Sequence, residues 1–368
     1  MNKPRIIISG GGTGGHIFPA LSIANSLKEL CPEAEILFVG AEGKMEMERV
    51  PAAGYRIIGL PVAGLQRSLS LKNLSLPGKV MKSVGKAGEI IKEFKPDVAV
   101  GVGGYASAPL LWSASRAGIP CLIQEQNSYA GLTNKILSKR AARICTAYEG
   151  MERFFPADRI ILTGNPIRKE IAPATPEQRQ EGYRFYGLDP QKKTLFVVGG
   201  SLGCGTLNRV MRDWVQNRAA KAGYQVIWQC GKAYKKGVDE FMAGRDVPNL
   251  IYTDFIQRMD LAYAVADLLV SRAGAGTISE LCVAGKATIF VPSPNVAEDH
   301  QTHNAMALVG KNAALMVRDA DADTQLLDTV ERLISDETRL LDLEKNILRL
   351  GRKDASEVIA KEVLKLIK

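Results

Sequence analysis

The sequence predicts an α/β protein made of two tandem domains, each a parallel sheet covered by helices. Three observations support this prediction. Short apolar runs rich in β-branched residues alternate with helix-length segments along the chain. The alternation stops at a charged, proline-rich stretch, residues 164–193, and then starts again. Each half also opens with a strand, a glycine-rich turn and a helix, and the two openings lie about 190 residues apart.

The strands expected in the first half are Arg5–Ser9, Glu35–Val39, Tyr55–Gly59, Asp97–Val102, Pro120–Gln124, Arg143–Thr146 and Ile160–Thr163. The stretch 164–193 is interpreted as a linker with a short helix. The strands expected in the second half are Thr194–Val198, Gln225–Trp228, Leu250–Thr253, Leu268–Ser271, Ala287–Val291 and Ala313–Val317. The tail from residue 336 to 368 is expected to be helical and to pack on either domain.

Composition narrows the class of protein. A length of 368 residues favours two cores, and 46% hydrophobic with 24% charged residues is typical of a globular chain. No apolar run is long enough to span a bilayer, and the N-terminus lacks a signal-peptide pattern, so we expect a cytosolic protein. Six scattered cysteines without a C-x-x-C pair suit a reducing compartment. The net charge of +9 favours an anionic partner, whereas 6% aromatic residues without clustering argue against nucleic acid.

The first glycine turn, "SGGGTGGH", matches the G-x-G-x-x-G pattern through Gly10, Gly12 and Gly15. Glycine amides at such a turn can approach a phosphate closely, and the following helix adds partial positive charge. The second strand ends "LFVGAEG", without an acidic residue at its tip for a nucleotide ribose, and this argues against a dinucleotide. We therefore expect an anion or sugar-oxygen site at residues 10–16, although tight turn packing alone would also explain the pattern.

Two further turns of the first half carry candidate groups. Gly103 and Gly104 in "GVGGYASAP" place backbone amides at the carboxyl end of a strand, where open α/β folds bind ligands. In "QEQNSYAGLTNK" four polar residues end an apolar strand, and Glu125 among them can act as a general base or orient one. A tight turn and a helix-capping turn are the alternatives for these two segments, and both alternatives stay open.

In the second half, "SRAGAGTISELCVAGK" opens a helix with Glu280 near its start. Beside the turn Gly199–Ser201, Glu280 is a candidate for ribose hydroxyls, although a carboxylate there also complements the helix dipole. His300 and His303, spaced i, i+3, are candidate metal ligands, but the only other histidine is His16, so we expect no metal. The "RDADAD" segment resembles a metal-binding D-x-D, and its position before a helix favours capping.

Residues 56–88 contain six basic residues and no acidic residue, with leucines interspersed. Such a segment suits docking on an anionic membrane surface. An ordinary helix–loop–helix with leucines in the core and lysines in water fits equally well.

Seven stretches together resemble the MurG family of glycosyltransferases and occur in the family's order over most of the chain: "GGTGGHIFPAL", "GVGGYASAP", "EQNSYAGLTNK", "GNPIR", "VVGGSLG", "SRAGAGTISE" and "DHQTHNA". The resemblance implies a GT-B fold, in which two Rossmann-like parallel-sheet domains face across a cleft. The implied division is 1–165 for the acceptor and membrane domain, 166–340 for the UDP-sugar domain, and 341–368 for a C-terminal helix that returns to the first domain.

The implied activity is inverting transfer of GlcNAc from UDP-GlcNAc to the C4 hydroxyl of MurNAc in lipid I (undecaprenyl-diphospho-MurNAc-pentapeptide), which gives lipid II for peptidoglycan. The resemblance also implies that the reaction needs no cofactor and no metal in the site. The resemblance also implies a peripheral protein on the cytoplasmic side of the plasma or inner membrane, in contact with anionic lipid and with other cell-wall synthesis proteins.

Motif matching carries site residues over from the family. The implied donor residues are Thr13, Gly14, Gly15, Asn127, Arg168, Ser201, Ile256, Ala275, Gly276, Thr277, Ile278, Ser279, Glu280 and Gln301. The implied acceptor residues are His16, Gly103, Gly104 and Tyr105. The chain departs from the family at Gln124, where histidine is frequent, at Leu202 and Cys204 in "GGSLGC", and at Gly276.

For the base that accepts the acceptor proton, His16 is the first candidate because imidazole titrates near neutrality, and Glu125 is the second. Arg168, glycine amides and helix N-termini would stabilise the leaving diphosphate. The alternatives are another GT-B enzyme that uses a UDP-sugar (a glycolipid synthase or a UDP-GlcNAc 2-epimerase), a nicotinamide-dependent oxidoreductase, and a non-catalytic lipid-binding scaffold.

Overall fold

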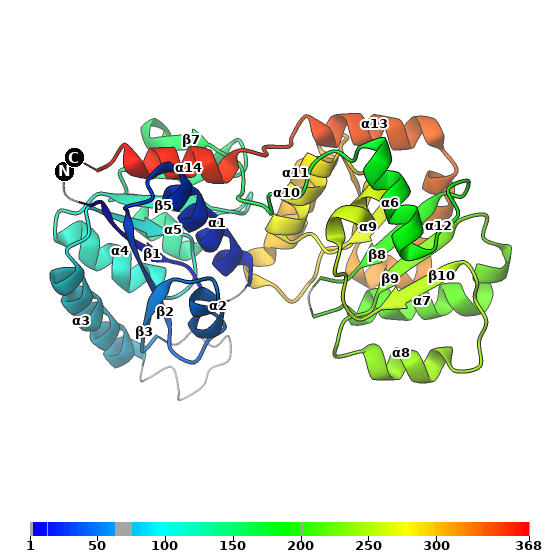
Figure 1. The fold of residues 1–368 in the computed structure, drawn as a ribbon, viewed down its shortest axis with the longest axis horizontal. Coiled ribbons are helices and arrows are strands. Elements are labelled where there is room, and N and C mark those ends of the chain that lie inside the picture. Colours follow the sequence, from blue (N-terminus) through cyan, green and yellow to red (C-terminus); the bar gives the residue numbers. More distant parts are fainter. Residues whose placement is uncertain (1–2, 13, 63–75, 201, 368) are drawn as a thin grey trace. The chain divides into compact units, whose positions relative to one another are not determined.

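The computed structural model describes residues 3–12, 14–62, 76–200 and 202–367. The chain forms two compact units (Figure 1). Unit 1 comprises Met1–Arg168 and Arg352–Lys368, and unit 2 comprises Lys169–Gly351. Unit 1 is therefore built from two separate parts of the sequence.

Unit 1 contains a seven-stranded parallel sheet in the order β3-β2-β1-β4-β5-β6-β7. Its strands are β1 (Arg5–Ser9), β2 (Glu35–Ala41), β3 (Arg56–Leu60), β4 (Val98–Gly101), β5 (Cys121–Glu125), β6 (Arg143–Thr146) and β7 (Ile160–Leu162). Both faces of the sheet are covered, and this explains why Ile6, Ile7 and Ile8 form an unbroken apolar run with no exposed surface.

The helices of unit 1 are α1 (Gly14–Leu30), α2 (Glu46–Ala52), α3 (Leu76–Phe94), α4 (Ser107–Arg116), α5 (Leu132–Leu137) and α14 (Ala355–Leu364). The last of these, α14, follows unit 2 in the sequence and lies beside α1 (Figure 1). Its Ile359, Ala360 and Val363 are fully buried in the same core cluster as β1 and α1. Helix α14 is therefore part of the core of unit 1.

Unit 2 contains a six-stranded parallel sheet in the order β10-β9-β8-β11-β12-β13. Its strands are β8 (Thr194–Val198), β9 (Gln225–Gln229), β10 (Leu250–Thr253), β11 (Leu268–Ser271), β12 (Thr288–Phe290) and β13 (Leu315–Met316). Its helices are α6 (Pro176–Tyr186), α7 (Gly205–Asn217), α8 (Lys235–Met242), α9 (Met259–Val265), α10 (Ala275–Ala284), α11 (His300–Val309), α12 (Ala322–Ile334) and α13 (Glu337–Leu348). The predicted α/β class with two parallel sheets is confirmed.

The short helix expected within residues 164–193 is present as α6, and residues 169–193 belong to unit 2. Helix α6 begins with a capping box, in which Thr175 Oγ1 accepts from the Gln178 amide at 3.2 Å and Gln178 Oε1 accepts from the Thr175 amide at 3.0 Å. The helix packs against α9 and belongs to unit 2. Its low apolar content hid this packing, because Gly182 permits close approach where side chains usually supply the contact.

The helical tail is interrupted at residues 349–354, so α13 lies in unit 2 and α14 in unit 1. All six cysteines are free and buried, and burial raises the pKa of Cys121, Cys145 and Cys282 to about 12. Among the helices that the structure describes, none combines the length and apolar character required to cross a bilayer.

Candidate active site

Both sheets have the strand order of a doubly wound fold, and the order reverses direction between β1 and β4 in unit 1 and between β8 and β11 in unit 2. Open α/β sheets bind ligands at the carboxyl ends of the strands beside such a reversal. The glycine turns singled out in the sequence follow these four strands. Each unit therefore places its candidate groups at its own ligand-binding edge.

In unit 1, His16 lies in the first turns of α1, directly after the glycine turn. Its Nδ1 is 3.1 Å from the carbonyl oxygen of Gly11. Because a carbonyl only accepts, Nδ1 carries the proton, and the lone pair of the neutral ring is on Nε2. This tautomer is the one in which the half-buried imidazole can accept a proton at Nε2.

Gly103 and Gly104, which follow β4, pack directly against this histidine turn. Their φ angles are +94° and +88°, a region that favours glycine. A Cβ on Gly103 would lie 2.7 Å from His16 Cδ2, and a Cβ on Gly104 would lie 2.3 Å from the Gly11 oxygen. Both glycines are thus required for close approach of the two turns. The next residue, Tyr105, is 54% exposed.

The four polar residues at the end of β5 are engaged within unit 1. Glu125 is 2% exposed, and its carboxylate accepts from the Asn127 amide at 3.0 Å, the Gly131 amide at 3.1 Å and Asn134 Nδ2 at 2.9 Å. Burial raises the pKa of this carboxyl, and these hydrogen bonds lower it by less. The arrangement suits a group that shapes the following turn.

Gln124, at the carboxyl end of β5, is fully buried. Its Nε2 donates to Asn165 Oδ1 at 2.9 Å, and Asn165 Nδ2 donates to the Gln126 carbonyl at 3.0 Å. This network links the "EQN" and "GNP" segments. Residue 124 therefore makes a structural contact, which sequence reasoning did not identify.

In unit 2 the glycine turn after β8 leads into α7. The amide of Gly199 donates to Gln229 Oε1 at 3.1 Å, and Gly200 has a φ of +86°. Cys204 caps α7, since its sulfur accepts from the Leu207 amide at 3.4 Å. Leu202 is 78% exposed. Cys204 therefore takes part in the start of α7, whereas Leu202 takes no part in the core of unit 2.

After β11, helix α10 begins at Ala275, and residues 275–280 form its first turns. Glu280 is 9% exposed, and Tyr263 donates its hydroxyl to Glu280 Oε2 at 3.2 Å. A Cβ at Gly276 would meet no atom within 4 Å, so the missing side chain leaves open space. Thr277 and Ser279 are half-buried, and Ile278 is buried.

Gln301 connects two strand ends of unit 2. Its Oε1 accepts from the Ala273 amide at 3.2 Å and from the Ser293 amide at 2.8 Å. Its side-chain orientation is thereby fixed at the edge where α10 begins. Ile256 is 4% exposed and follows β10, whereas Arg168 is exposed at the end of the first part of unit 1.

The structure brings the predicted residues together in two groups, one in each unit. His16, Gly103 and Gly104 are in contact in unit 1. Residues 275–280 and Gln301 share the ligand-binding edge of unit 2. Thr13 and Ser201 lie outside the described residues, and so do residues 63–75 of the basic segment. Glu46 and Tyr263, which contact these groups, were not predicted.

The candidate metal ligands have other roles in the structure. His300 Nδ1 lies 2.8 Å from the Ala297 carbonyl oxygen. In the "RDADAD" segment, Asp319 pairs with Arg272 at 2.6 Å and accepts from Thr206 Oγ1 at 3.1 Å. Across the described ranges, no three His, Cys, Asp or Glu side chains form a group that could hold a metal ion.

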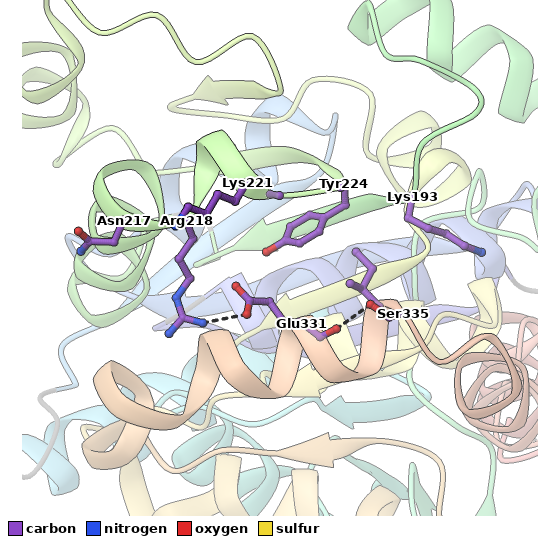
Figure 2. Close-up of a pocket in the computed structure, with 10 residues that line it drawn as sticks. Lys193, Asn217, Arg218, Lys221, Tyr224, Glu331 and Ser335 are labelled. Carbon is purple, nitrogen blue, oxygen red and sulfur yellow. Dashed lines mark hydrogen bonds and ion pairs between the residues drawn. The ribbon is translucent and has the colours of Figure 1, made fainter.

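A separate pocket of about 470 Å³ lies in unit 2 (Figure 2). Lys193 and Tyr224 in its wall directly precede β8 and β9, so the pocket is at the amino ends of these strands. Arg218 pairs there with Asp328 at 2.7 Å and with Glu331 at 3.0 Å. The pocket is thus at the opposite end of the sheet from the glycine turns.

Comparison with known proteins identifies the family. Residues 6–146 match the glycosyltransferase family 28 N-terminal domain, and residues 194–359 match the glycosyltransferase family 28 C-terminal domain. The chain is 56% identical, over 98% of its length and 95% of the relative's, to the UDP-N-acetylglucosamine–N-acetylmuramyl-(pentapeptide) pyrophosphoryl-undecaprenol N-acetylglucosamine transferase of Bacteroides fragilis. The chain belongs to the MurG family.

Solved structures agree with this MurG-family assignment. The crystal structure of Acinetobacter baumannii MurG superposes with a TM-score of 0.80 at 26% identity and covers 99% of this chain and 100% of that one. A Neisseria meningitidis UDP-GlcNAc 2-epimerase superposes with a TM-score of 0.66 at 12% identity, over 99% and 100% of the two chains. The likeness to the epimerase shows a shared fold only, so it does not support the epimerase alternative.

Proposed function

We propose that this chain transfers GlcNAc from UDP-GlcNAc to the C4 hydroxyl of MurNAc in undecaprenyl-diphospho-MurNAc-pentapeptide. The observation that carries the proposal is the 56% identity to a transferase of that name along nearly the whole of both chains. The two ligand-binding edges, each with a glycine turn and a helix N-terminus, suit a donor and an acceptor that both contain diphosphate.

The donor residues are assigned mainly to unit 2. Glu280, held by Tyr263, would accept hydrogen bonds from the ribose hydroxyls of UDP-GlcNAc. The glycine turn with Ser201 and the start of α7 would face the diphosphate, because the partial positive charge at a helix N-terminus favours anions. Gln301 would donate a hydrogen bond to the donor through Nε2, since its Oε1 already accepts hydrogen bonds from two backbone amides. The remaining donor residues are Thr13, Gly14, Gly15, Asn127, Arg168, Ile256 and Ala275–Ser279.

The acceptor residues are assigned to unit 1. His16 Nε2 would accept the proton of the C4 hydroxyl while that oxygen attacks the anomeric carbon of GlcNAc. The bond from the anomeric carbon to the UDP oxygen breaks, and UDP leaves from the opposite face, which inverts the configuration. Arg168 and backbone amides would stabilise the developing charge on the diphosphate. Gly103, Gly104 and Tyr105 border His16 and would contact the acceptor.

Glu125 is assigned a positioning role in this scheme. Its carboxylate is 2% exposed and accepts from three partners within 3.1 Å, which leaves little access for a substrate hydroxyl. A general base must come within hydrogen-bond reach of the proton that it removes. His16, which is less buried, meets this requirement better.

A peripheral location on the cytoplasmic face of the membrane follows from a lipid-linked acceptor. In α3, Val80 is 51% exposed and Met81 is 76% exposed, and the neighbouring Lys82 is exposed as well. Apolar side chains beside cations are typical of surfaces that bind anionic lipid. We propose that this part of α3 contacts the membrane, where other cell-wall synthesis proteins would also be met.

The test is transfer of labelled GlcNAc from UDP-GlcNAc to a short-chain lipid I analogue, with and without EDTA. We expect a disaccharide product with a β-1,4 link and equal rates in both conditions. Absence of transfer would contradict the proposed activity, and release of UDP without the lipid would favour an epimerase. Transfer that stops with EDTA would contradict only the metal-independent mechanism.

A further inference from the structure

Glu46 is a buried carboxylate directly beneath the first glycine turn. It is the first residue of α2, and it has no exposed surface. One oxygen, Oε2, accepts from the Gly12 amide at 3.0 Å, and the other, Oε1, accepts from the Ala41 amide at 2.9 Å. Within the described part of the chain, no cation pairs with this carboxylate. Its contacts are therefore directed at the backbone of two strand ends.

Two glycines make room for the Glu46 side chain. A Cβ on Gly11 would lie 2.1 Å from Glu46 Oε1, and a Cβ on Gly40 would lie 2.5 Å from Glu46 Cγ. These distances are far below van der Waals contact, so the turn after β1 and the end of β2 close around the carboxylate. The space is filled by this one side chain.

The same turn holds His16. The Gly12 amide donates a hydrogen bond to Glu46. The carbonyl oxygen of the preceding residue, Gly11, accepts a hydrogen bond from His16 Nδ1. The Gly11 carbonyl carbon and the Gly12 nitrogen belong to one planar peptide unit. Its N–H is bound by Glu46 and its C=O by His16, so rotation of this unit would disturb both contacts. Gly104 packs against the same carbonyl oxygen.

We propose that Glu46 is a positioning residue for His16, because it fixes the 11–12 peptide unit whose carbonyl orients the imidazole. The inference rests on the proposed function and deepens it, since it assigns a role to a residue outside the acceptor group. Glu46 touches no substrate in this scheme. It acts through the peptide unit and holds Nδ1 as the protonated nitrogen, so that Nε2 is the base.

The first experiment compares Glu46→Gln with Glu48→Gln, a control that changes an exposed glutamate of the same helix. A glutamine offers one acceptor and one donor, so it can satisfy only one of the two amides. We expect Glu46→Gln to lower kcat by about 10- to 100-fold with the KM for UDP-GlcNAc unchanged, because misplacing a catalytic group by an ångström has effects of this order. Glu48→Gln should match the wild type.

A double-mutant cycle with His16→Ala separates positioning from a general structural role. If Glu46 acts through His16, adding Glu46→Gln to His16→Ala should lower kcat by less than twofold more. Gly11→Ala, which pushes a methyl group into the Glu46 carboxylate, gives an independent perturbation and should reproduce the loss if Glu46→Gln fails to fold. Far-ultraviolet circular dichroism and thermal unfolding establish that each variant is folded.

Each failure has a distinct signature. No transfer by the wild type would contradict the proposed function. Full activity of His16→Ala would remove His16 from the chemistry and the present inference with it. Two results would overturn the role of Glu46 and leave the proposed function standing. One is a wild-type kcat in folded Glu46→Gln, and the other is that Glu46→Gln lowers kcat in the His16→Ala background as much as it does in the wild type. A rise in the KM for UDP-GlcNAc with unchanged kcat would also overturn it.

Discussion

The Nδ1 atom of His16 lies 3.1 Å from the carbonyl oxygen of Gly11, five residues earlier in the chain. This hydrogen bond fixes the tautomer, because the backbone carbonyl accepts the Nδ1 proton. The basic nitrogen of the neutral ring is then Nε2. The contact also couples the orientation of the imidazole to the conformation of the glycine turn.

Replacing His16 with alanine should lower kcat by about 10²- to 10⁴-fold, the usual contribution of a general base. Binding of UDP-GlcNAc should change little, because the donor is assigned mainly to unit 2. Initial rates with a lipid I analogue and calorimetric titration with UDP measure the two effects. His303→Ala, on an exposed position of α11, serves as the control histidine. Full turnover by His16→Ala would remove this residue from the mechanism.

Gly103→Ala should impair catalysis through His16. The new Cβ would lie 2.7 Å from His16 Cδ2 and 2.8 Å from Nε2, so the ring must move. Gly118→Ala is the matched control, because Gly118 also has a positive φ, +76°, but a Cβ there meets nothing within 4 Å. Both variants should lose about 1–3 kcal/mol of unfolding free energy from backbone strain. Only Gly103→Ala should lose most of its kcat, and equal activity losses would contradict the contact.

Glu125 should give the protein a pH-dependent stability. Burial holds its folded-state pKa above the ordinary value of 4.5. Its contribution to the free energy of unfolding is therefore full below pH 4.5 and is lost as the pH rises through the folded-state pKa. The glutamine of Glu125→Gln cannot ionise. The free energy of unfolding of the wild type minus that of the variant should therefore decrease as the pH rises above 4.5. Urea unfolding at a series of pH values measures this difference, and a constant or rising difference would contradict the direction of the pKa shift.

Tyr263→Phe should weaken donor binding, because Glu280 Oε2 loses the hydroxyl that lies 3.2 Å away. We expect a rise of about 3- to 10-fold in the KM for UDP-GlcNAc, equivalent to roughly 0.7–1.4 kcal/mol, with kcat nearly unchanged. With a 2′-deoxyribose analogue of the donor, wild type and variant should become equal. Tyr186→Phe, which removes a hydroxyl bonded to the Arg258 carbonyl, is the control. If the variant still has a higher KM than the wild type for the analogue, the loss of binding does not arise from the contact between Glu280 and the ribose 2′-hydroxyl.

The strands were predictable because parallel strands buried on both faces must be short, continuous apolar runs, as Ile6–Ile8 are. All thirteen predicted strands are present, and they form the two parallel sheets. The extent of β13 was overestimated, since only Leu315 and Met316 pair with β12. The short helix in 164–193 was predicted, but its packing against α9 was not, because that contact uses Gly182 and few apolar side chains.

The glycine turns and His16 were predictable because local sequence determines a strand–turn–helix unit. Glu46 and Tyr263 were not predictable, since their partners lie 34 and 17 residues away and the contacts exist only in the folded sheet. The sequence does show Glu46 a few residues after β2 ends at Ala41, but nothing local indicates that its carboxylate binds the backbone of the first glycine turn.

The placement of α14 has a consequence for how the chain is made. Ile359, Ala360 and Val363 complete the core around β1 and α1, yet they follow all of unit 2 in the sequence. During synthesis, every strand of the first sheet therefore leaves the ribosome long before α14, the helix that completes the core on one face of that sheet. During that interval the apolar side of α1 lacks the cover that α14 provides, and exposed apolar surface of this kind favours aggregation until α14 packs on it.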